Sequence, residues 1–186
     1  MYYGIADYEP RYCTTVDEVT RTVGDNLRQL IGRPFSAAYL IWDQDDEWHP
    51  DGPVVLRFKD LQLEICAWGL DKLSLTFNEI DLGHSPSWYD SSVTLKWRLD
   101  PFEEFVGLVD GRVEAISVLE FHSQARVVSS NNPSEIGKVE SAWLLPGIEL
   151  QFTSGWLSVY NALDENGISF QETLIPEIRK TLIAGA

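Results

Sequence analysis

The stretch VVLRFKDLQLEICAWGLDKLSLTF, residues 54–77, returns in altered form as IELQFTSGWLSVYNALDENGISF, residues 148–170. The matching apolar residues are Leu56, Phe58, Leu63 and Ile65 with Leu150, Phe152, Leu157 and Val159 and, after one deletion, Leu75 and Phe77 with Ile168 and Phe170. In both stretches apolar residues alternate with polar ones, which is typical of half-buried β-strands. The sequence therefore predicts two related three-stranded meanders.

The likeness extends to the residues before each meander. Gly32-Arg33 and Gly111-Arg112 each follow a predicted helix and precede an apolar strand, at 35–42 and 112–119. We therefore expect one α+β domain over residues 1–186, mainly antiparallel β, with pseudo-repeats at about 12–81 and 98–174. Independent strand patterning in the two halves is the alternative to a true duplication.

One long helix is predicted near the N-terminus. Thr15 and Glu18 have the spacing of a capping box, and apolar residues then recur at helical spacing until Gly32 and Pro34 end the pattern. A short second helix is expected at about 101–107, with Asp100 as its N-cap and Pro101 at its first position. Residues 43–52, 79–91 and 128–137 read as loops, and 93–98 as a further strand.

The turns of the second meander carry the clearest local signals. Ser154-Gly155 suits a two-residue hairpin, and Asn166-Gly167 is a strong signal for another. The second hairpin would pair Leu163 with Phe170 and place Leu163 in the core. The last segment, 176–183, is expected to form a short helix with Ile178 and Leu182 turned inward.

Composition and charge limit the classes of partner. The chain is 44% hydrophobic and 23% charged, which is typical of a globular protein, and its net charge is −15. Such a field repels nucleic-acid phosphates and anionic membranes, so neither partner is expected. It favours a basic protein partner or an imitation of nucleic acid, whereas solubility alone is the simpler explanation.

The chain shows no signal for export or membrane insertion. The N-terminal sequence MYYGIADYEP lacks a signal peptide's basic and apolar regions, and no apolar run is long enough for a membrane span. Two cysteines do not form a disulfide framework. We therefore expect a cytoplasmic, bacterial protein.

Motifs of catalysis and cofactor binding are absent from the sequence. His49, His84 and His122 are scattered without ligand spacing, and no zinc, phosphate-loop or nucleotide-binding pattern occurs. A hydrolase site assembled from distant residues remains open. Cys66 is expected to pack as a small apolar residue. Cys13 lies beside a helix start, where the pKa of a thiol can fall, but a structural or idle cysteine is favoured there. The prediction is a protein that is not an enzyme and has no cofactor.

Residues 43–51 form the candidate binding loop. The predicted partner-binding residues are Asp43, Asp45, Asp46, Glu47, Trp48 and Asp51. An exposed Trp48 among carboxylates would serve as an anchor with a charged rim. The acids also resemble a calcium loop, but Trp48 occupies the position of the required Gly and no Glu stands at the twelfth place. No metal site is therefore predicted.

The segments GRVEAISVLE (111–120) and LQFTSGWLSVYNALDENGISF (150–170) resemble small bacterial proteins, among them immunity proteins that neutralise polymorphic or contact-dependent toxins. The resemblance implies a cytosolic, non-enzymatic inhibitor, often acidic because many nuclease toxins are basic. The first functional hypothesis is therefore inhibition of a basic toxin. A small-ligand or carbohydrate-binding β module is the alternative, and a deep aromatic pocket would favour it.

Overall fold

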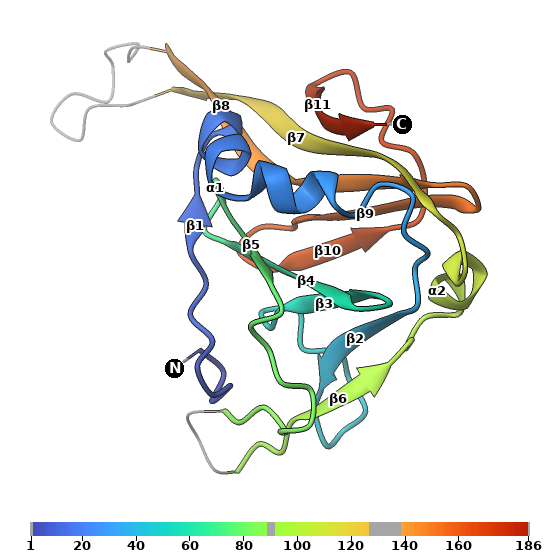
Figure 1. Ribbon diagram of the computed structural model, residues 1–186. Coiled ribbons are helices and arrows are strands. Elements are labelled where there is room, and N and C mark those ends of the chain that lie inside the picture. Colours follow the sequence, from blue (N-terminus) through green and yellow to red (C-terminus); the bar gives the residue numbers. More distant parts are fainter. Residues whose placement is uncertain (1, 89–91, 127–138, 186) are drawn as a thin grey trace, which may run out of the picture.

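The computed structural model describes residues 2–88, 92–126 and 139–185, and these form two antiparallel β-sheets packed on each other (Figure 1). The six-stranded first sheet has the order β1-β5-β4-β3-β2-β6 and the five-stranded second sheet the order β10-β9-β8-β7-β11. The first sheet consists of β1 (Tyr12–Cys13), β2 (Ala37–Trp42), β3 (Val54–Phe58), β4 (Leu61–Trp68), β5 (Lys72–Phe77) and β6 (Lys96–Leu99). The second consists of β7 (Val113–Arg126), β8 (Val139–Phe152), β9 (Gly155–Asn161), β10 (Asn166–Ser169) and β11 (Ile178–Gly185), and the helices are α1 (Val16–Arg28) and α2 (Glu103–Leu108).

The two similar sequence stretches both form antiparallel meanders, β3-β4-β5 and β8-β9-β10. Their registers also agree. Leu56 pairs with Leu63 as Leu150 pairs with Leu157, and Ile65 pairs with Leu75 as Val159 pairs with Ile168. The alignment made from the sequence therefore places equivalent residues at equivalent positions of the two sheets.

The strand that follows each meander also returns to the same place. β6 pairs antiparallel with β2, and β11 pairs antiparallel with β7, so each sheet is extended beside the strand that precedes its meander. The two glycine-arginine segments lie side by side: Gly32 N donates to Val113 O at 2.8 Å and Val113 N donates to Arg33 O at 3.0 Å. A common origin of the halves remains a prediction.

The core lies between the inner faces of the sheets and continues under both helices. Leu56, Leu63, Leu150 and Leu157 are fully buried there, with Phe35, Phe58, Phe105 and Phe152 among the aromatic side chains. The helix α1 contacts strands of both sheets and buries Val19 and Leu27 against them. Burial of each such side chain contributes about 1.5–3 kcal/mol of hydrophobic free energy.

The predicted helix start is confirmed. Thr15 Oγ1 accepts from Glu18 N at 3.2 Å, and Glu18 Oε2 accepts from Thr14 N at 2.8 Å. The helix proper ends at Arg28, and Gly32 follows with a φ of 78°, a conformation that suits glycine. At α2 the expected N-cap is wrong, because Phe102 precedes the helix. Asp100 instead accepts a hydrogen bond from Ala38 N of β2 at 2.6 Å.

Two predictions near the C-terminus are also wrong. Asn166 is not in a turn but begins β10, opposite Asn161, so the connection is made by residues 162–165 and Leu163 is 82% exposed. Residues 178–185 form strand β11 rather than a helix, and Leu182 is exposed. The predicted loop at 128–137 lies outside the described residues.

The outer faces of the two sheets are covered to different extents. On the first sheet, residues from the N-terminal segment and from the β5–β6 connection form a second apolar cluster, in which Tyr8, Ile80 and Leu95 cover Ile41 and Val55. On the second sheet the β10–β11 connection, residues 170–177, occupies the equivalent place. It leaves a cavity described below.

Candidate functional site

The predicted binding loop connects β2 to β3 and is closed by its own first carboxylate. Asp43 Oδ1 accepts hydrogen bonds from the amides of Asp45 and Glu47, both at 2.9 Å. The side chains of Asp45, Asp46 and Glu47 are exposed. The sequence therefore identified a surface loop rich in carboxylates, although its use for binding remains a prediction.

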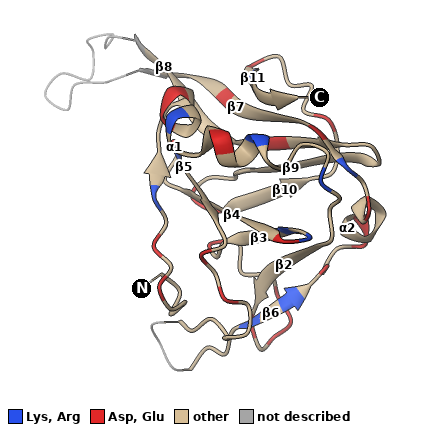
Figure 2. Ribbon diagram, viewed as in Figure 1, with Lys and Arg blue, Asp and Glu red and all other residues tan. Residues whose placement is uncertain are grey.

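Asp46 has cationic neighbours on the adjacent edge strand β6. Its Oδ1 lies 2.9 Å from Arg98 Nη1 and 3.6 Å from Lys96 Nζ. Figure 2 shows this concentration of basic residues on β6, whereas acidic residues are spread over both helices and several connections. Because exposed ion pairs contribute about 0–1 kcal/mol, the pairs stabilise the loop only slightly, but they offset part of its negative charge.

Trp48 does not have the exposed position expected of an anchor. Its ring is half-buried and meets Phe102 edge to face, with centroids 5.7 Å apart, and its backbone bridges to Trp42. Asp51 lies on another side of the loop, at a small pocket with Tyr2. The loop thus presents Asp43, Asp45, Asp46 and Glu47 together and directs Trp48 toward the core.

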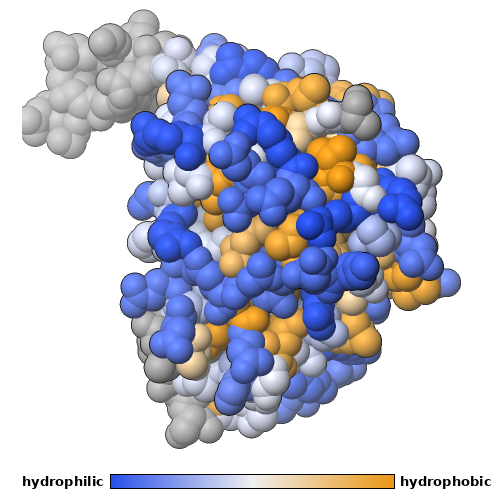
Figure 3. Space-filling model, in the orientation of Figure 1, coloured by the Kyte–Doolittle hydropathy of each residue, from blue (hydrophilic) through white to orange (hydrophobic). Residues whose placement is uncertain are grey.

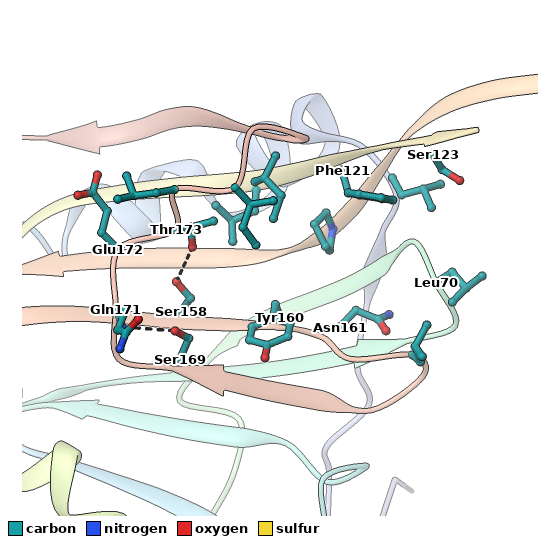
Figure 4. A pocket seen from close by; sticks show the side chains of 17 residues that line it. Leu70, Phe121, Ser123, Ser158, Tyr160, Asn161, Ser169, Gln171, Glu172 and Thr173 are labelled. Atoms are coloured by element: carbon teal, nitrogen blue, oxygen red, sulfur yellow. Dashed lines mark hydrogen bonds between the residues drawn. The ribbon is translucent and has the colours of Figure 1, made fainter. Parts of the chain in front are cut away.

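A cavity with a volume of about 620 Å³ lies on the outer face of the second sheet. We call it the apolar pocket, and its apolar lining includes Leu70, Leu119, Phe121, Tyr160, Leu174 and Ile175. Figure 4 shows Phe121 entering from β7, Tyr160 from β9 and Leu70 from the β4–β5 turn. Five separate segments of the chain therefore create the pocket.

Buried polar groups lie along one side of the apolar pocket. Ser158 and Thr173 share a hydrogen bond of 3.3 Å between their hydroxyls (Figure 4), and Thr173 N donates to Glu149 Oε2 at 2.7 Å. Glu149 is 2% exposed and is paired with Lys180 Nζ at 2.7 Å. This network ties the β10–β11 connection to the sheet and holds the pocket open between them.

The rim of the apolar pocket is unusually exposed for apolar side chains. Leu163 is 82% exposed, Leu174 75% and Ile175 54%. Glu172 also lines the pocket, with its carboxylate paired to Lys180 Nζ at 3.3 Å, and Asp164 and Glu165 follow Leu163 directly in the exposed connection. Sequence reasoning missed this site because it assigned Leu163 to the core. The run Leu174-Ile175-Pro176, which continues neither a strand nor a helix, was the available signal.

Both cysteines are buried, as expected for cysteines with a structural role. Burial raises the pKa of the Cys13 thiol, so the helix start beside it does not lower that pKa. Burial also raises the pKa of Cys66, which lies within hydrogen-bond distance of the Tyr2 hydroxyl at 3.3 Å. In the ranges 2–88, 92–126 and 139–185, no three His, Cys, Asp or Glu side chains lie together in a group that could hold a metal ion.

Comparison of the chain with protein families, with curated proteins and with solved structures found no match. None of the helices in the described part of the chain is long and apolar enough to cross a membrane. The function of this protein is therefore inferred from its own pockets and exposed side chains.

Proposed function

We propose that this protein is a non-enzymatic binding protein that captures a basic protein partner in the bacterial cytoplasm, as an immunity protein captures a toxin. The observation that carries the proposal is the apolar pocket with its exposed rim of Leu163, Leu174 and Ile175 in a protein of net charge −15. Hydrophilic residues cover most of the face drawn in Figure 3, and hydrophobic residues reach the surface in a few places between them.

The exposed apolar rim and the carboxylates beside it favour a protein partner. Contiguous apolar side chains exposed to water mark interaction sites, because they gain free energy only when a partner covers them. Carboxylates beside the rim, such as Asp164 and Glu165, would be left unpaired by an acidic partner and would attract a basic one. The proposed partner therefore brings apolar anchors surrounded by Lys and Arg.

Copurification from the producing cell, with two variants, tests this proposal. Leu163→Asp/Leu174→Asp places two charges in the rim, and Leu99→Asp/Val106→Asp places the same charges at exposed apolar positions away from it. We expect the wild type and the second variant to retain one stoichiometric basic protein, and the first variant to lose it. Equal retention by both variants, or an acidic partner, would contradict the proposal.

Association kinetics with that partner test the electrostatic part. Because charges are screened beyond about 10 Å at 0.1 M salt, the association rate should fall steeply as salt rises, while dissociation changes little. If the partner is a toxin, coexpression of the wild type should restore growth, and coexpression of Leu163→Asp/Leu174→Asp should not. An association rate independent of salt would count against capture by charge.

A small-ligand binding protein is the second candidate function. The apolar pocket has a volume of about 620 Å³, within the roughly 300–1,000 Å³ of small-molecule sites, and its buried Ser158 hydroxyl supplies a polar contact. Mass spectrometry of the freshly purified protein under native conditions distinguishes the two. A bound small molecule that is lost in Leu119→Trp, which fills the pocket, would favour this second function.

The proposal also includes duplication of one structural unit. The offset of 94 positions that relates Leu56 to Leu150 also relates Leu63 to Leu157. Leu56 is the cross-strand partner of Leu63, as Leu150 is of Leu157. Under this proposal one copy kept a covered outer face and the other became the binding surface. Relatives in which one half occurs alone would support duplication.

A further inference from the structure

A second, smaller pocket lies beside the first, across the contact between the β4–β5 turn and the 162–165 connection. Its volume is about 210 Å³. We call it the aromatic–acidic pocket, and it is lined by Tyr2, Tyr3, Trp68, Trp88, Asp51 and Asp164, together with Ala67. Four aromatic residues and two acidic residues thus line one small cavity.

The rings of this pocket hold one another in place. Tyr2 and Tyr3 meet edge to face with centroids 4.9 Å apart, and Tyr3 and Trp88 lie 5.0 Å apart. His49 contacts Trp88 at 4.9 Å from the side of the acidic loop. The Tyr2 hydroxyl donates to Asp51 O at 3.2 Å, and burial raises the pKa of Tyr2, so this ring is neutral in the folded protein.

The carboxylate of Asp164 is held by a backbone amide. Asp164 Oδ1 accepts a hydrogen bond from Gly69 N at 2.5 Å, which orients the group. Among residues 2–88, 92–126 and 139–185, no Lys, Arg or His forms a salt bridge with Asp51 or Asp164. Carboxylates beside aromatic faces form the environment in which an organic cation is attracted both by charge and by the ring quadrupoles.

We propose that the aromatic–acidic pocket binds an organic cation and that, under the function proposed above, this cation is an arginine side chain of the basic partner. A cavity of about 210 Å³ is smaller than those that hold drug-sized ligands and suits one side-chain head group. Arginine fits best because its planar guanidinium stacks on aromatic rings while its edge donates to carboxylates.

The position of the pocket agrees with this assignment. Trp68 and Asp164 line the aromatic–acidic pocket, whereas Leu70 and Leu163, close to them in sequence, line the apolar pocket. Asn161 Nδ2 donates to Gly69 O at 2.5 Å, so the two segments are joined directly. One partner segment can therefore place an apolar side chain in one pocket and an arginine in the other.

Lys72 is the intramolecular competitor. Its Nζ lies 4.4 Å from the centroid of the Trp68 ring, so one ring of the pocket already attracts a cation. Lys72 does not line the pocket itself. Replacing it by methionine should therefore strengthen binding of an added cation, by about twofold to threefold.

The proposal is tested by titrating the isolated protein with N-acetyl-arginine methylamide and following the tryptophan indole signals by NMR. Trp68→Phe and Trp88→Phe assign the relevant signals. We expect both indoles to shift and Trp143, which already has Arg179 at 4.3 Å, to remain unchanged. The neutral isostere N-acetyl-citrulline methylamide should bind at least about fivefold more weakly. Equal shifts with citrulline would overturn the proposal.

Further variants and probes test two points separately: whether the carboxylates attract the cation, and whether the cation is a partner side chain or a free ligand. The variant Asp51→Asn/Asp164→Asn keeps the shape of the side chains and the contact with Gly69, but it should weaken binding of the arginine probe about fivefold. The control variant Glu104→Gln/Asp110→Asn removes two charges at exposed sites elsewhere and should leave binding of the probe unchanged. Tetramethylammonium tests a free quaternary ligand, and binding tighter than arginine would overturn the assignment to a partner side chain. Cation binding without a copurified partner would reject the proposed function alone, and a partner without cation binding would reject this inference alone.

Discussion

The two sheets share the order of five strands and the register of their meanders, although β1 extends the first sheet, and they differ in what covers their outer faces. On the first sheet the N-terminal segment and the β5–β6 connection bury Ile41 and Val55 beneath Tyr8, Ile80 and Leu95. On the second sheet the β10–β11 connection covers the equivalent face only in part and leaves a cavity of about 620 Å³. The strand framework therefore determines the core, and the connections determine whether a face is closed or available for binding.

A buried glutamate at equivalent positions of the two outer faces also has different partners in the two sheets. Val55 pairs with Glu64, and at the equivalent place Glu149 pairs with Ser158, so each sheet carries one glutamate on this cross-strand pair. Glu64 is fully buried and accepts hydrogen bonds from Gln62 and Thr76, both at 2.7 Å. Glu149 instead pairs with Lys180 of the last strand.

The largest effect is expected from Asn166→Ala, which breaks the connection between the two sheets. Asn166 is 1% exposed; its amide donates to Pro50 O and Gly52 O at 2.9 and 2.8 Å and accepts from Ala67 N at 2.9 Å. Leaving these buried groups unpaired should lower the free energy of unfolding by about 3–5 kcal/mol in urea denaturation. Leu163→Ala in the neighbouring exposed connection is the control, and an equal cost for both would contradict the role given to Asn166.

A pair of isoleucines compares the covered face with the open one. Ile80 is 5% exposed and Ile175 54%, so Ile80→Ala should cost about 2–4 kcal/mol and Ile175→Ala about 0.5 kcal/mol or less. Urea denaturation measures both. Ile175→Ala should weaken partner binding, whereas Ile80→Ala should leave it unchanged at temperatures where the variant is folded. Similar stability losses would remove the distinction between the two faces.

The glutamates are expected to respond in opposite directions. Glu149→Gln should lower the free energy of unfolding by about 1–3 kcal/mol, because it breaks a buried ion pair whose lysine is partly exposed. Glu64→Gln should raise it at neutral pH, since glutamine keeps the hydrogen-bonding shape without a buried charge.

The pH dependence of Glu64 follows from the direction of its pKa. Burial raises the pKa of Glu64 above its unfolded value, so the folded state binds more protons. The contribution of this group to stability therefore increases as pH falls through the folded pKa and is complete below the unfolded pKa of about 4.3. The difference between wild type and Glu64→Gln, measured by denaturation at several pH values, should shrink on acidification. A difference that grows would refute this assignment.

The smallest stability change is expected in the acidic loop. Replacing Asp45, Asp46 and Glu47 together by Ser should change the free energy of unfolding by about 0.5 kcal/mol or less, since all three are exposed. If the loop joins the binding surface, the same change should slow association with the partner. Trp48→Ala should raise the dissociation rate if the ring is an anchor, but it should also reduce stability through the lost contact with Phe102. Wild-type affinity in both variants would exclude the loop from binding.

Local pattern was sufficient to predict the meanders, the start of α1 and the acidic loop, because each depends on residues close in sequence. Prediction from local pattern failed where contacts with a segment distant in sequence determine the local conformation. Asn166-Gly167 has turn chemistry, yet Asn166 satisfies the backbone of residues 50–67 and so belongs to a strand. Ile178 and Leu182 have helical spacing, but β7 offers an unpaired edge that the last segment fills as β11. Each pocket is lined by four or more segments that are far apart in the sequence, so no local pattern could predict it.

Asn166 also has a consequence for synthesis on the ribosome. The carbonyl groups of Pro50 and Gly52 and the amide of Ala67 find their partner only in Asn166, a residue made much later. The strand β11, which completes the second sheet and contacts α1, emerges later still. On a nascent chain these three groups therefore stay without their native partner until Asn166 has been made, and the second sheet stays incomplete until β11 emerges.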